Sequence, residues 1–253
     1  MTDYPNSIIS VQYHLSDSYT VPICNQRDSF YGVTGTPTTW FDGRIERVGA
    51  YQNDNQMYNW YESAMNTRLG VATDVTIDLE VNKVGAQTYR VTATVGVEPG
   101  GTAKTMVVHF LQVLDYYPSY SDNRYRNTAR DHSEATISVG AGDSKSVDSA
   151  DFLIDGADWD HKENVRFVVW AQETGSSAPR EVYQAAVIDL PQPVEGDIDG
   201  DGDVDLGDLA IMLGAYGTCQ GDPNYDPLAD LSGDGCVDLV DLAVLLGNYG
   251  YGT

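Results

Sequence analysis

A 21-residue pattern that occurs twice near the end of the chain constrains the fold most. The first copy begins at Asp197 and reads DIDGDGDVDLGDLAIMLGAYG, and the second begins at Asp230 and reads DLSGDGCVDLVDLAVLLGNYG. The copies are 33 residues apart, and 14 of the 21 aligned positions are identical. An unfolded acidic tail would not keep its glycines and leucines in register. We therefore expect each copy to fold as one loop followed by one helix.

Oxygen-bearing side chains stand at positions 1, 3, 5, 9 and 12 of each copy, with glycine at position 6. This is the spacing of a calcium loop, in which the backbone carbonyl of residue 7 is a further ligand. The six aspartates of the first loop would repel one another without a cation, and Mg²⁺ fits less well because it requires a tight octahedron. The pattern predicts two Ca²⁺ ions, held by Asp197, Asp199, Asp201, Asp203 (carbonyl), Asp205 and Asp208, and by Asp230, Ser232, Asp234, Cys236 (carbonyl), Asp238 and Asp241.

Apolar residues follow each loop at helical spacing. Each set predicts one apolar stripe on a helix, and such a stripe needs a partner that covers it. The simplest partner is the other copy. The stripes are Leu209, Met212, Leu213 and Tyr216 in the first copy, and Leu242, Leu245, Leu246 and Tyr249 in the second.

Two features distinguish this repeat from an ordinary EF-hand pair. Position 12 is Asp rather than Glu, and the segment before the first loop, LPQPVEG from Leu190, predicts no amphipathic helix. A duplicated loop and helix of this kind resembles the type I dockerin family over residues 197–253. The resemblance implies a calcium-dependent module that binds a cohesin domain, a system best known from polysaccharide-degrading assemblies. Positions 10 and 11, which recognise the partner in that family, are here Leu206-Gly207 and Leu239-Val240 rather than of the Ser-Thr type.

The likeness of the two copies predicts two near-equivalent docking faces that rest on apolar burial. The competing interpretation places Leu206 and Leu239 in the core of the module. The faces would be built on Leu206, Gly207, Leu209 and Met212 in one orientation, and on Leu239, Val240, Leu242 and Leu245 in the other.

Two of the three cysteines belong to the repeat. Cys219 lies just beyond the first predicted helix, and Cys236 lies inside the second loop. A two-fold arrangement of the copies would bring the end of one helix near the loop of the other, which makes a disulfide between them a candidate. It would stabilise the module by about 3 kcal/mol. The alternative is two unpaired thiols.

Residues 8–69 predict the order strand, helix, strand, strand, helix, at 8–14, 24–31, 38–41, 44–48 and 55–69. This order, with GVTGTPTTWFDG at its centre, resembles the C-terminal half of a thioredoxin-like fold. The resemblance implies a cis-proline at Pro37, where an ordinary turn proline is the alternative. The redox chemistry of that family requires a C-x-x-C motif, which this sequence lacks. Cys24 is not at the nucleophile position and is expected to be a small buried apolar residue.

From Val75 onwards the apolar residues alternate with polar ones. Strands are expected at 75–81, 89–97, 106–114, 135–139, 165–171 and 182–188, which together predict an antiparallel sandwich of immunoglobulin-like type. We therefore expect a multi-domain chain: a partial α/β thioredoxin-like segment at 1–70, the sandwich at 71–190, a linker at 191–196 and the small α-helical calcium-loop module at 197–253. A thioredoxin-like half followed by a sandwich resembles Omp28-related secreted proteins.

Other polar residues give weaker predictions. Tyrosines and arginines between Asp115 and His132 predict a sugar- or peptide-binding surface, with a loop packed on its own sandwich as the alternative. The acids between Asp155 and Glu163 are interpreted as a turn. The four histidines show no metal-ligand spacing, and His109 is expected to be a core residue. No G-x-S-x-G, P-loop or H-E-x-x-H motif occurs, so we expect no enzyme activity.

Charge limits the partners. The net charge is −24, with 38 acidic and 14 basic residues, which makes nucleic acid an unsuitable partner. The longest apolar runs are too short to span a membrane. Calcium loops and a candidate disulfide favour an extracellular or cell-surface location, although the sequence contains no signal peptide and we expect the N-terminus to be incomplete.

Three functional hypotheses follow. The first is a non-catalytic secreted modular protein that docks by calcium to a cohesin-type partner, within a polysaccharide-degrading or cell-surface assembly. The second is a thiol–disulfide oxidoreductase whose C-x-x-C half lies outside this sequence. The third is a carbohydrate-binding accessory protein that acts through the sandwich.

Overall fold

A computed structural model describes residues 7–85, 87–117, 125–192 and 194–252. The chain divides into two compact units, Met1–Leu190 and Pro191–Thr253. The boundary between the units lies after Leu190, just beyond the last strand of the sandwich and at the start of the predicted linker. The sequence predicts a separate segment at 1–70, whereas the structure groups this segment with the sandwich in the first unit, because α1 packs on one of the sheets.

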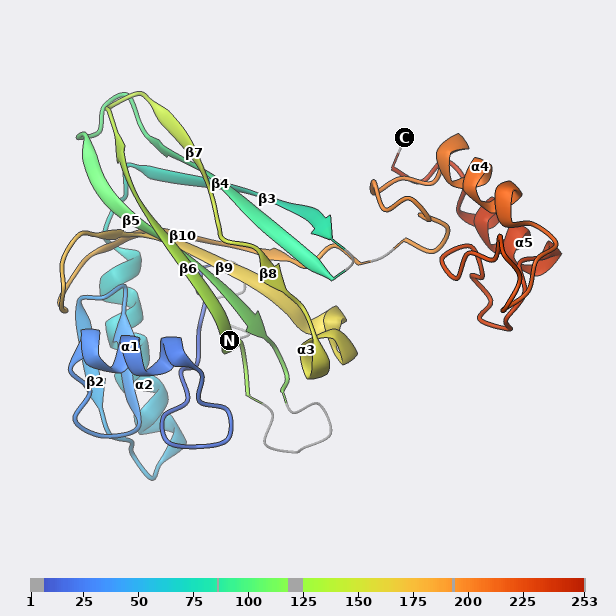
Figure 1. The fold of residues 1–253 in the computed structure, drawn as a ribbon. Coiled ribbons are helices and arrows are strands. Elements are labelled where there is room, and N and C mark those ends of the chain that lie inside the picture. The colour runs from blue at the N-terminus through green and yellow to red at the C-terminus, as the bar shows by residue number, and fades with distance from the viewer. Residues whose placement is uncertain (1–6, 86, 118–124, 193, 253) are drawn as a thin grey trace. The chain divides into compact units, whose positions relative to one another are not determined.

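Two antiparallel sheets form most of the first unit (Figure 1). One sheet has the order β10-β9-β5-β6, from β10 (Val182–Asp189), β9 (Val165–Glu173), β5 (Lys104–Leu114) and β6 (Thr128–Val139). The other has the order β3-β4-β7, from β3 (Val75–Gly85), β4 (Thr88–Val97) and β7 (Ser144–Asp148), with β8 (Phe152–Leu153) also paired to β4. The described residues therefore form a sandwich-like β region, as the alternating pattern predicts.

The inward positions of both sheets form the core of the sandwich. Successive residues of a strand point to opposite faces, so alternate apolar residues of β4, β5 and β9 meet between the sheets. The largest buried members include Met106, Phe110, Phe152, Ile154 and Phe167.

The structure departs from the predicted strands in two places. The sequence pattern predicts neither β7 nor β8. β7 contains no large apolar residue that would mark an inward position, and β8 has only two residues. β6 begins at Thr128, so the last part of the predicted Asp115–His132 insertion is strand. Tyr120 and Arg124, two of the residues in that predicted binding surface, lie outside the described residues.

The N-terminal segment contains α1 (Pro22–Tyr31), β1 (Thr38–Phe41), β2 (Ile45–Val48) and α2 (Asp54–Leu69). α1 begins with a proline, which needs no N–H partner in the first turn, and ends at Gly32 in the left-handed conformation. The side chain of Asn53 caps α2. The expected strand at 8–14 does not form; of these residues, Gln12 alone makes an isolated parallel bridge, to Thr128.

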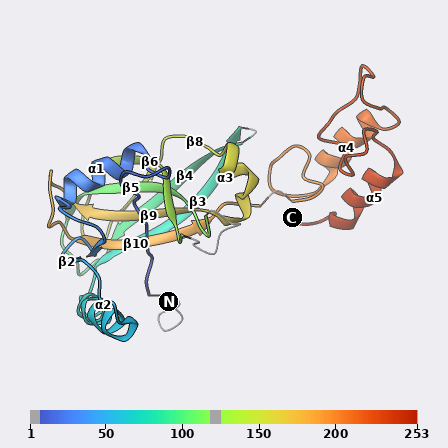
Figure 2. The same ribbon diagram turned by 90° about the horizontal axis from the view of Figure 1, so that it is seen from below.

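The first part of the unit, up to α1, packs on the outer face of the β10-β9-β5-β6 sheet (Figures 1 and 2). Ile23 and Cys24 of α1 join a second apolar cluster with Leu111, Val168 and Trp170, among other residues. The β1–β2 turn is held by the connection between β9 and β10, because the backbone N–H of Arg180 donates to the carbonyl of Gly43 at 3.0 Å. A Cβ at Gly43 would stand 2.0 Å from the Arg180 carbonyl oxygen, and its φ is +67°, so only glycine fits. The outer face of the sheet is therefore apolar where α1 covers it.

The second unit consists of two loops and two ten-residue helices, α4 (Leu206–Ala215) and α5 (Leu239–Asn248). Its core consists of Ile198, Val204, Met212, Ala215, Ala229, Val237 and Leu245. The predicted stripes are only partly covered: Met212 and Leu245 are fully buried, whereas Leu213 and Leu246 are 57% and 53% exposed. Val204 and Val237 from the loops fill part of the core. Each short helix therefore buries only one side, and the rest of its apolar stripe stays exposed.

Candidate functional site

The first acidic loop is closed by hydrogen bonds from its own backbone to its carboxylates. Asp197 accepts from the N–H of Gly200 at 2.6 Å and of Gly202 at 3.2 Å. Asp208, at the start of α4, accepts from Ile198 at 2.6 Å and from Asp205 at 2.8 Å. The first and last ligands of the predicted set thus hold the loop in a ring.

The second loop repeats this arrangement. Asp230 accepts from Gly233 and Gly235, each at 2.9 Å. Asp241 accepts from Ser232 at 2.8 Å and from Asp238 at 2.7 Å. One difference is that the hydroxyl of Tyr225 donates to Asp230 at 2.7 Å. The two sequence copies therefore fold into two equivalent loop-and-helix elements.

The loops place carboxylates very close together. Carboxylate oxygens of Asp197, Asp199 and Asp208 lie within 4.8 Å of one another, and so do those of Asp203, Asp205 and Asp208. The second loop contributes no such three-carboxylate group among the described residues, because Ser232 and Cys236 replace two aspartates.

The pKa values of carboxylates in the first loop are shifted in opposite directions. Burial alone would raise the pKa of Asp208, but hydrogen bonds from the backbone N–H groups of Asp205, Asp199 and Ile198 outweigh burial and lower it. Desolvation and the neighbouring carboxylates raise the pKa of Asp199 and of Asp203. Asp208 is thus stabilised as an anion by the fold, whereas Asp199 and Asp203 lack a compensating positive charge.

This donor set fits Ca²⁺. Calcium takes six to eight oxygens at about 2.3–2.6 Å, so oxygens around one ion are at most about twice that distance apart, and the carboxylate groups above lie within this limit. Asp208 and Asp241 are fully buried carboxylates, and Oδ1 of Asp203 is a buried atom without a hydrogen-bond partner. A hard cation among these oxygens would offset both the repulsion and the lost hydration.

The structure groups Asp197, Asp199, Asp203, Asp205 and Asp208 within one loop, as the predicted ligand set requires. It differs at position 7, because the side chain of Asp203 faces the other carboxylates, whereas the spacing assigned only its carbonyl. Asp201 and Asp234 accept from the backbone N–H groups two residues on, and neither belongs to the groups of close carboxylates in the part of the chain that the structure describes.

Cys219 and Cys236 form a disulfide, and an antiparallel bridge joins the same two residues. The remaining cysteine, Cys24, is buried and unpaired. The Thr36–Pro37 peptide bond is cis.

The predicted docking residues divide into exposed and buried sets. Leu206, Leu239 and Val240 are 68%, 67% and 54% exposed, so these leucines do not turn into the core. Met212 and Leu245, which were also assigned to the docking faces, are fully buried and offer no surface to a partner.

The acids between Asp155 and Glu163 form a short helix, α3 (Gly156–Asp160), and a 3-10 turn rather than a simple turn. Asp158 is buried and accepts from Gln112 at 2.6 Å and from Arg130 at 2.7 Å. Asp115 is paired with Arg126 by two hydrogen bonds, at 2.6 and 2.9 Å. These arginines of the predicted sugar surface therefore hold buried acids of their own unit.

The histidine prediction needs correction. Although no metal-ligand spacing was recognised, His109, His132 and Glu134 bring their ligand atoms within 4.8 Å of one another. The predicted strand at 135–139 does not include His132 and Glu134; β6 begins at Thr128 and places both on one face, because residues two apart in a strand share a face.

The described residues thus define a chain with a sandwich-like β unit and a unit of paired acidic loops. No family model and no curated protein matches the sequence. Among solved structures, the chain is similar to HBP35 of Porphyromonas gingivalis, with a TM-score of 0.51 and 12% identity over 66% of this chain and 57% of that one. The chain thus spans a little over half the length of that structure, and at this identity the likeness is one of fold.

A domain of the outer membrane lipoprotein Omp28, also from Porphyromonas gingivalis, matches with a TM-score of 0.31 and 15% identity over 47% of this chain and 90% of that domain. Among the described residues, no helix combines the length and the apolar composition needed to cross a bilayer.

Proposed function

We propose that this protein is a non-catalytic, secreted or cell-surface modular protein whose C-terminal unit, residues 197–253, is a dockerin-like module that binds two Ca²⁺ ions and docks to a cohesin-type domain. The observation that carries the proposal is the repetition of one hydrogen-bonded ring, from Asp197 to Asp208 and from Asp230 to Asp241. Each ring ends at the start of a helix, and the first ring also gathers carboxylates that have no compensating positive charge.

The acidic loops and the starts of the two helices would have different roles. The loop carboxylates would hold the ions, and the ions would fix the starts of α4 and α5, since Asp208 and Asp241 belong to both loop and helix. The exposed residues of those first turns, Leu206, Leu239 and Val240, would then present an apolar surface. Burial of such side chains in an interface contributes about 25 cal/mol per Å².

The sandwich-like unit would be the cargo that the module attaches to a surface or to a larger assembly. The apolar surface at the helix starts supports a protein partner with an apolar binding face. A strongly acidic partner would be repelled by the net charge of −24.

Binding of a cohesin-type domain by the full chain tests the proposal. Calorimetry in saturating Ca²⁺ should show a one-to-one complex that a chelator dissolves. The variants Leu206→Asp, Leu239→Asp and the double variant should weaken it, with the larger loss in the double variant because either helix could present the face. Leu228→Asp is the matched control, since Leu228 is equally exposed, at 65%, but lies outside both helices.

Circular dichroism must show that each variant folds and still binds Ca²⁺. Parent-like affinity in all three folded variants would place the docking surface elsewhere. A chain that binds no Ca²⁺ would refute the proposed module itself.

A further inference from the structure

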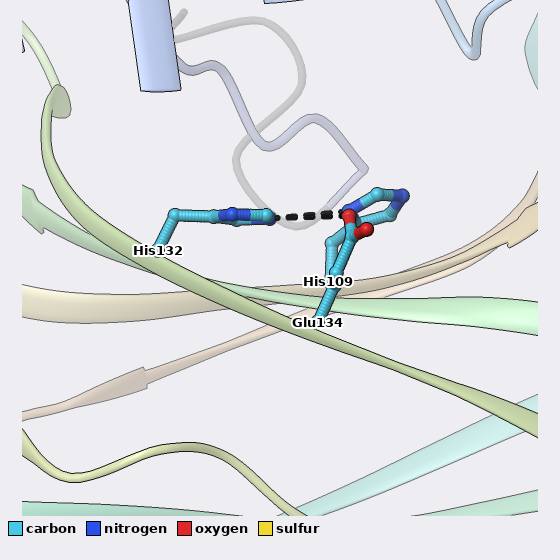
Figure 3. Close-up of side chains that lie close together, drawn as sticks. All are labelled: His109, His132 and Glu134. Atoms are coloured by element: carbon cyan, nitrogen blue, oxygen red, sulfur yellow. Dashed lines mark hydrogen bonds and ion pairs between the residues drawn. The ribbon is translucent and has the colours of Figure 1, made fainter. Parts of the chain in front are cut away.

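The outer face of the β10-β9-β5-β6 sheet carries a cluster of two histidines and a glutamate beside α1, whose residues line the same cavity as His109 and Glu134. His109 of β5 lies directly opposite Glu134 of β6, and His132 lies two residues before Glu134 on the same strand. Residues opposite one another, and residues two apart, share a face of a sheet. Figure 3 shows the three side chains standing on one side of the strands with their polar ends together.

The separations between these polar ends match those of ligands around one small cation. Nδ1 of His109 is 3.2 Å from Nε2 of His132 and 3.1 Å from a carboxylate oxygen of Glu134, and the His132 nitrogen is 3.9 Å from that oxygen. Tetrahedral zinc binds nitrogen and carboxylate oxygen at about 2.0–2.2 Å, so its ligands are roughly 3.3–3.6 Å apart. Two imidazoles and one carboxylate are a ligand set for Zn²⁺ and other first-row divalent metals.

Hydrogen bonding alone does not satisfy the cluster. Nδ1 of His109 lies within hydrogen-bond distance of both Nε2 of His132 and a carboxylate oxygen of Glu134. One hydrogen between these three atoms can serve only one pair of them, whereas a cation would contact all three at once.

The surroundings hold His109 in this orientation. Its ring is stacked on Trp170 of β9, with centroids 4.7 Å apart and an angle of 18° between the planes. The amide nitrogen of Gln172, beside this cluster in the cavity lining, donates to the carbonyl of Arg180, and its oxygen accepts from Arg27.

A cavity of about 600 Å³ leads to the cluster from solvent, and its lining includes His109, Glu134, Arg27 and Glu173. The side chain of Glu134 is 55% exposed, so it can adjust to an ion without repacking the sheet. The one cationic side chain in this lining, Arg27, is engaged with Gln172 and Tyr31. Glu173 is paired with Arg44, so Glu134 is the carboxylate of this lining that faces the imidazoles.

We propose that His109, His132 and Glu134 form a binding site for one divalent transition-metal ion of the zinc type, separate from the acidic loops. The two imidazole nitrogens and one carboxylate oxygen occupy three positions around the ion. The fourth faces the cavity and is open to water or to a small ligand.

Calorimetric titration of the full chain with Zn²⁺ tests this site, with saturating Ca²⁺ present to occupy the acidic loops. The parent should bind one equivalent of Zn²⁺. His132→Gln and Glu134→Gln should each weaken binding at least about tenfold, the scale of losses known for metal-site substitutions. His161→Gln is the control, because His161 lies outside the cluster and near Glu163.

Quenching of tryptophan fluorescence by Ni²⁺ locates the ion. Ni²⁺ should quench the fluorescence of the parent, and substitution of His109, His132 or Glu134 should weaken this quenching. Trp170→Phe should remove most of the quenching while Zn²⁺ still binds. Equal quenching in Trp170→Phe would place the metal elsewhere and overturn the proposal.

Absence of a Zn²⁺ equivalent in the parent would also overturn it, as would parent-like binding by either His132→Gln or Glu134→Gln. Circular dichroism checks that the variants fold. If His132→Gln does not fold, Glu134→Gln is the deciding variant, because the Glu134 side chain is largely exposed to solvent.

Discussion

Asp205 and Asp208 cap the start of α4 reciprocally. The side chain of Asp205 accepts from the backbone at the helix start, and that of Asp208 accepts from the backbone N–H of Asp205 at 2.8 Å. Asp238 and Asp241 do the same for α5. Because these residues are also predicted calcium ligands, loop closure and helix initiation depend on the same carboxylates.

Removal of one buried carboxylate should abolish one calcium site. We expect the parent to bind two Ca²⁺ in a calorimetric titration, with the first loop tighter because it has more carboxylates. Asp208→Ala should retain only the weaker site and Asp241→Ala only the tighter one. Glu195→Gln, an exposed acid of the same unit, should bind like the parent. Two sites in Asp208→Ala would show that this carboxylate is not a ligand.

Adjacent leucines of α5 should differ sharply in their effect on stability. Leu245 is fully buried and Leu246 is 53% exposed. Leu245→Ala should lower the free energy of unfolding of the C-terminal unit by about 2–5 kcal/mol, whereas Leu246→Ala should change it by about 0.5 kcal/mol or less. Urea unfolding in Ca²⁺, followed by circular dichroism, gives both values. Equal losses would contradict the core described above.

Removal of the Cys219–Cys236 disulfide should weaken the second unit without removing its calcium sites. The bridge closes a separation of 17 residues, so the double change to serine should cost about 3 kcal/mol. Cys236 is predicted to bind Ca²⁺ through its backbone carbonyl, which serine retains. Tryptophan fluorescence provides the internal control, since Trp40, Trp60, Trp159 and Trp170 all lie in the first unit. A lost calcium site would indicate that the loop depends on the bridge.

The Asp115–Arg126 pair should make the first unit sensitive to acid. Burial would raise the pKa of Asp115, but hydrogen bonds from Arg126 and from the Asn127 backbone outweigh it and lower the pKa. The stabilisation is therefore present above the unfolded pKa, near 3.9, and is lost as pH falls through the folded pKa. Asp115→Asn should cost about 1.5–3 kcal/mol at pH 7 and much less below pH 3.

Asp151→Asn is the matched control for this pair, because Asp151 and Arg90 form an ion pair in which both side chains are more than 40% exposed. It should cost less than about 1 kcal/mol at either pH. Unfolding followed by tryptophan fluorescence measures both variants. A cost for Asp115→Asn that does not change with pH would refute the electrostatic explanation.

The chain should show no disulfide reductase activity. Its single free thiol, Cys24, is fully buried, and one thiol cannot complete a two-thiol cycle. An insulin-reduction assay should show no turnover with the parent or with Cys24→Ser. Turnover that disappears in Cys24→Ser would favour the oxidoreductase hypothesis.

The sequence by itself determined the features that depend on local spacing. The acidic loops, their glycines and the starts of α4 and α5 follow from interactions within twelve residues, so the repeat from Asp197 predicted them closely. The alternating pattern after Val75 likewise predicted the long strands of the sandwich-like unit, because a half-covered strand must alternate.

Only the tertiary structure decided which residues far apart in the chain meet. The side chain of Leu213 stays exposed because the core is completed by Val204 and Val237 from the loops, which the helical spacing cannot reveal. Residues 8–14 pair with the sheet only at Gln12, while Ile9, Val11 and Tyr13 pack against the apolar cluster on its outer face. His109 and Glu134 are 25 residues apart in sequence and become neighbours through the register of β5 and β6. That register is set by the packing of both sheet faces, since a shift of one residue would move every side chain to the opposite face.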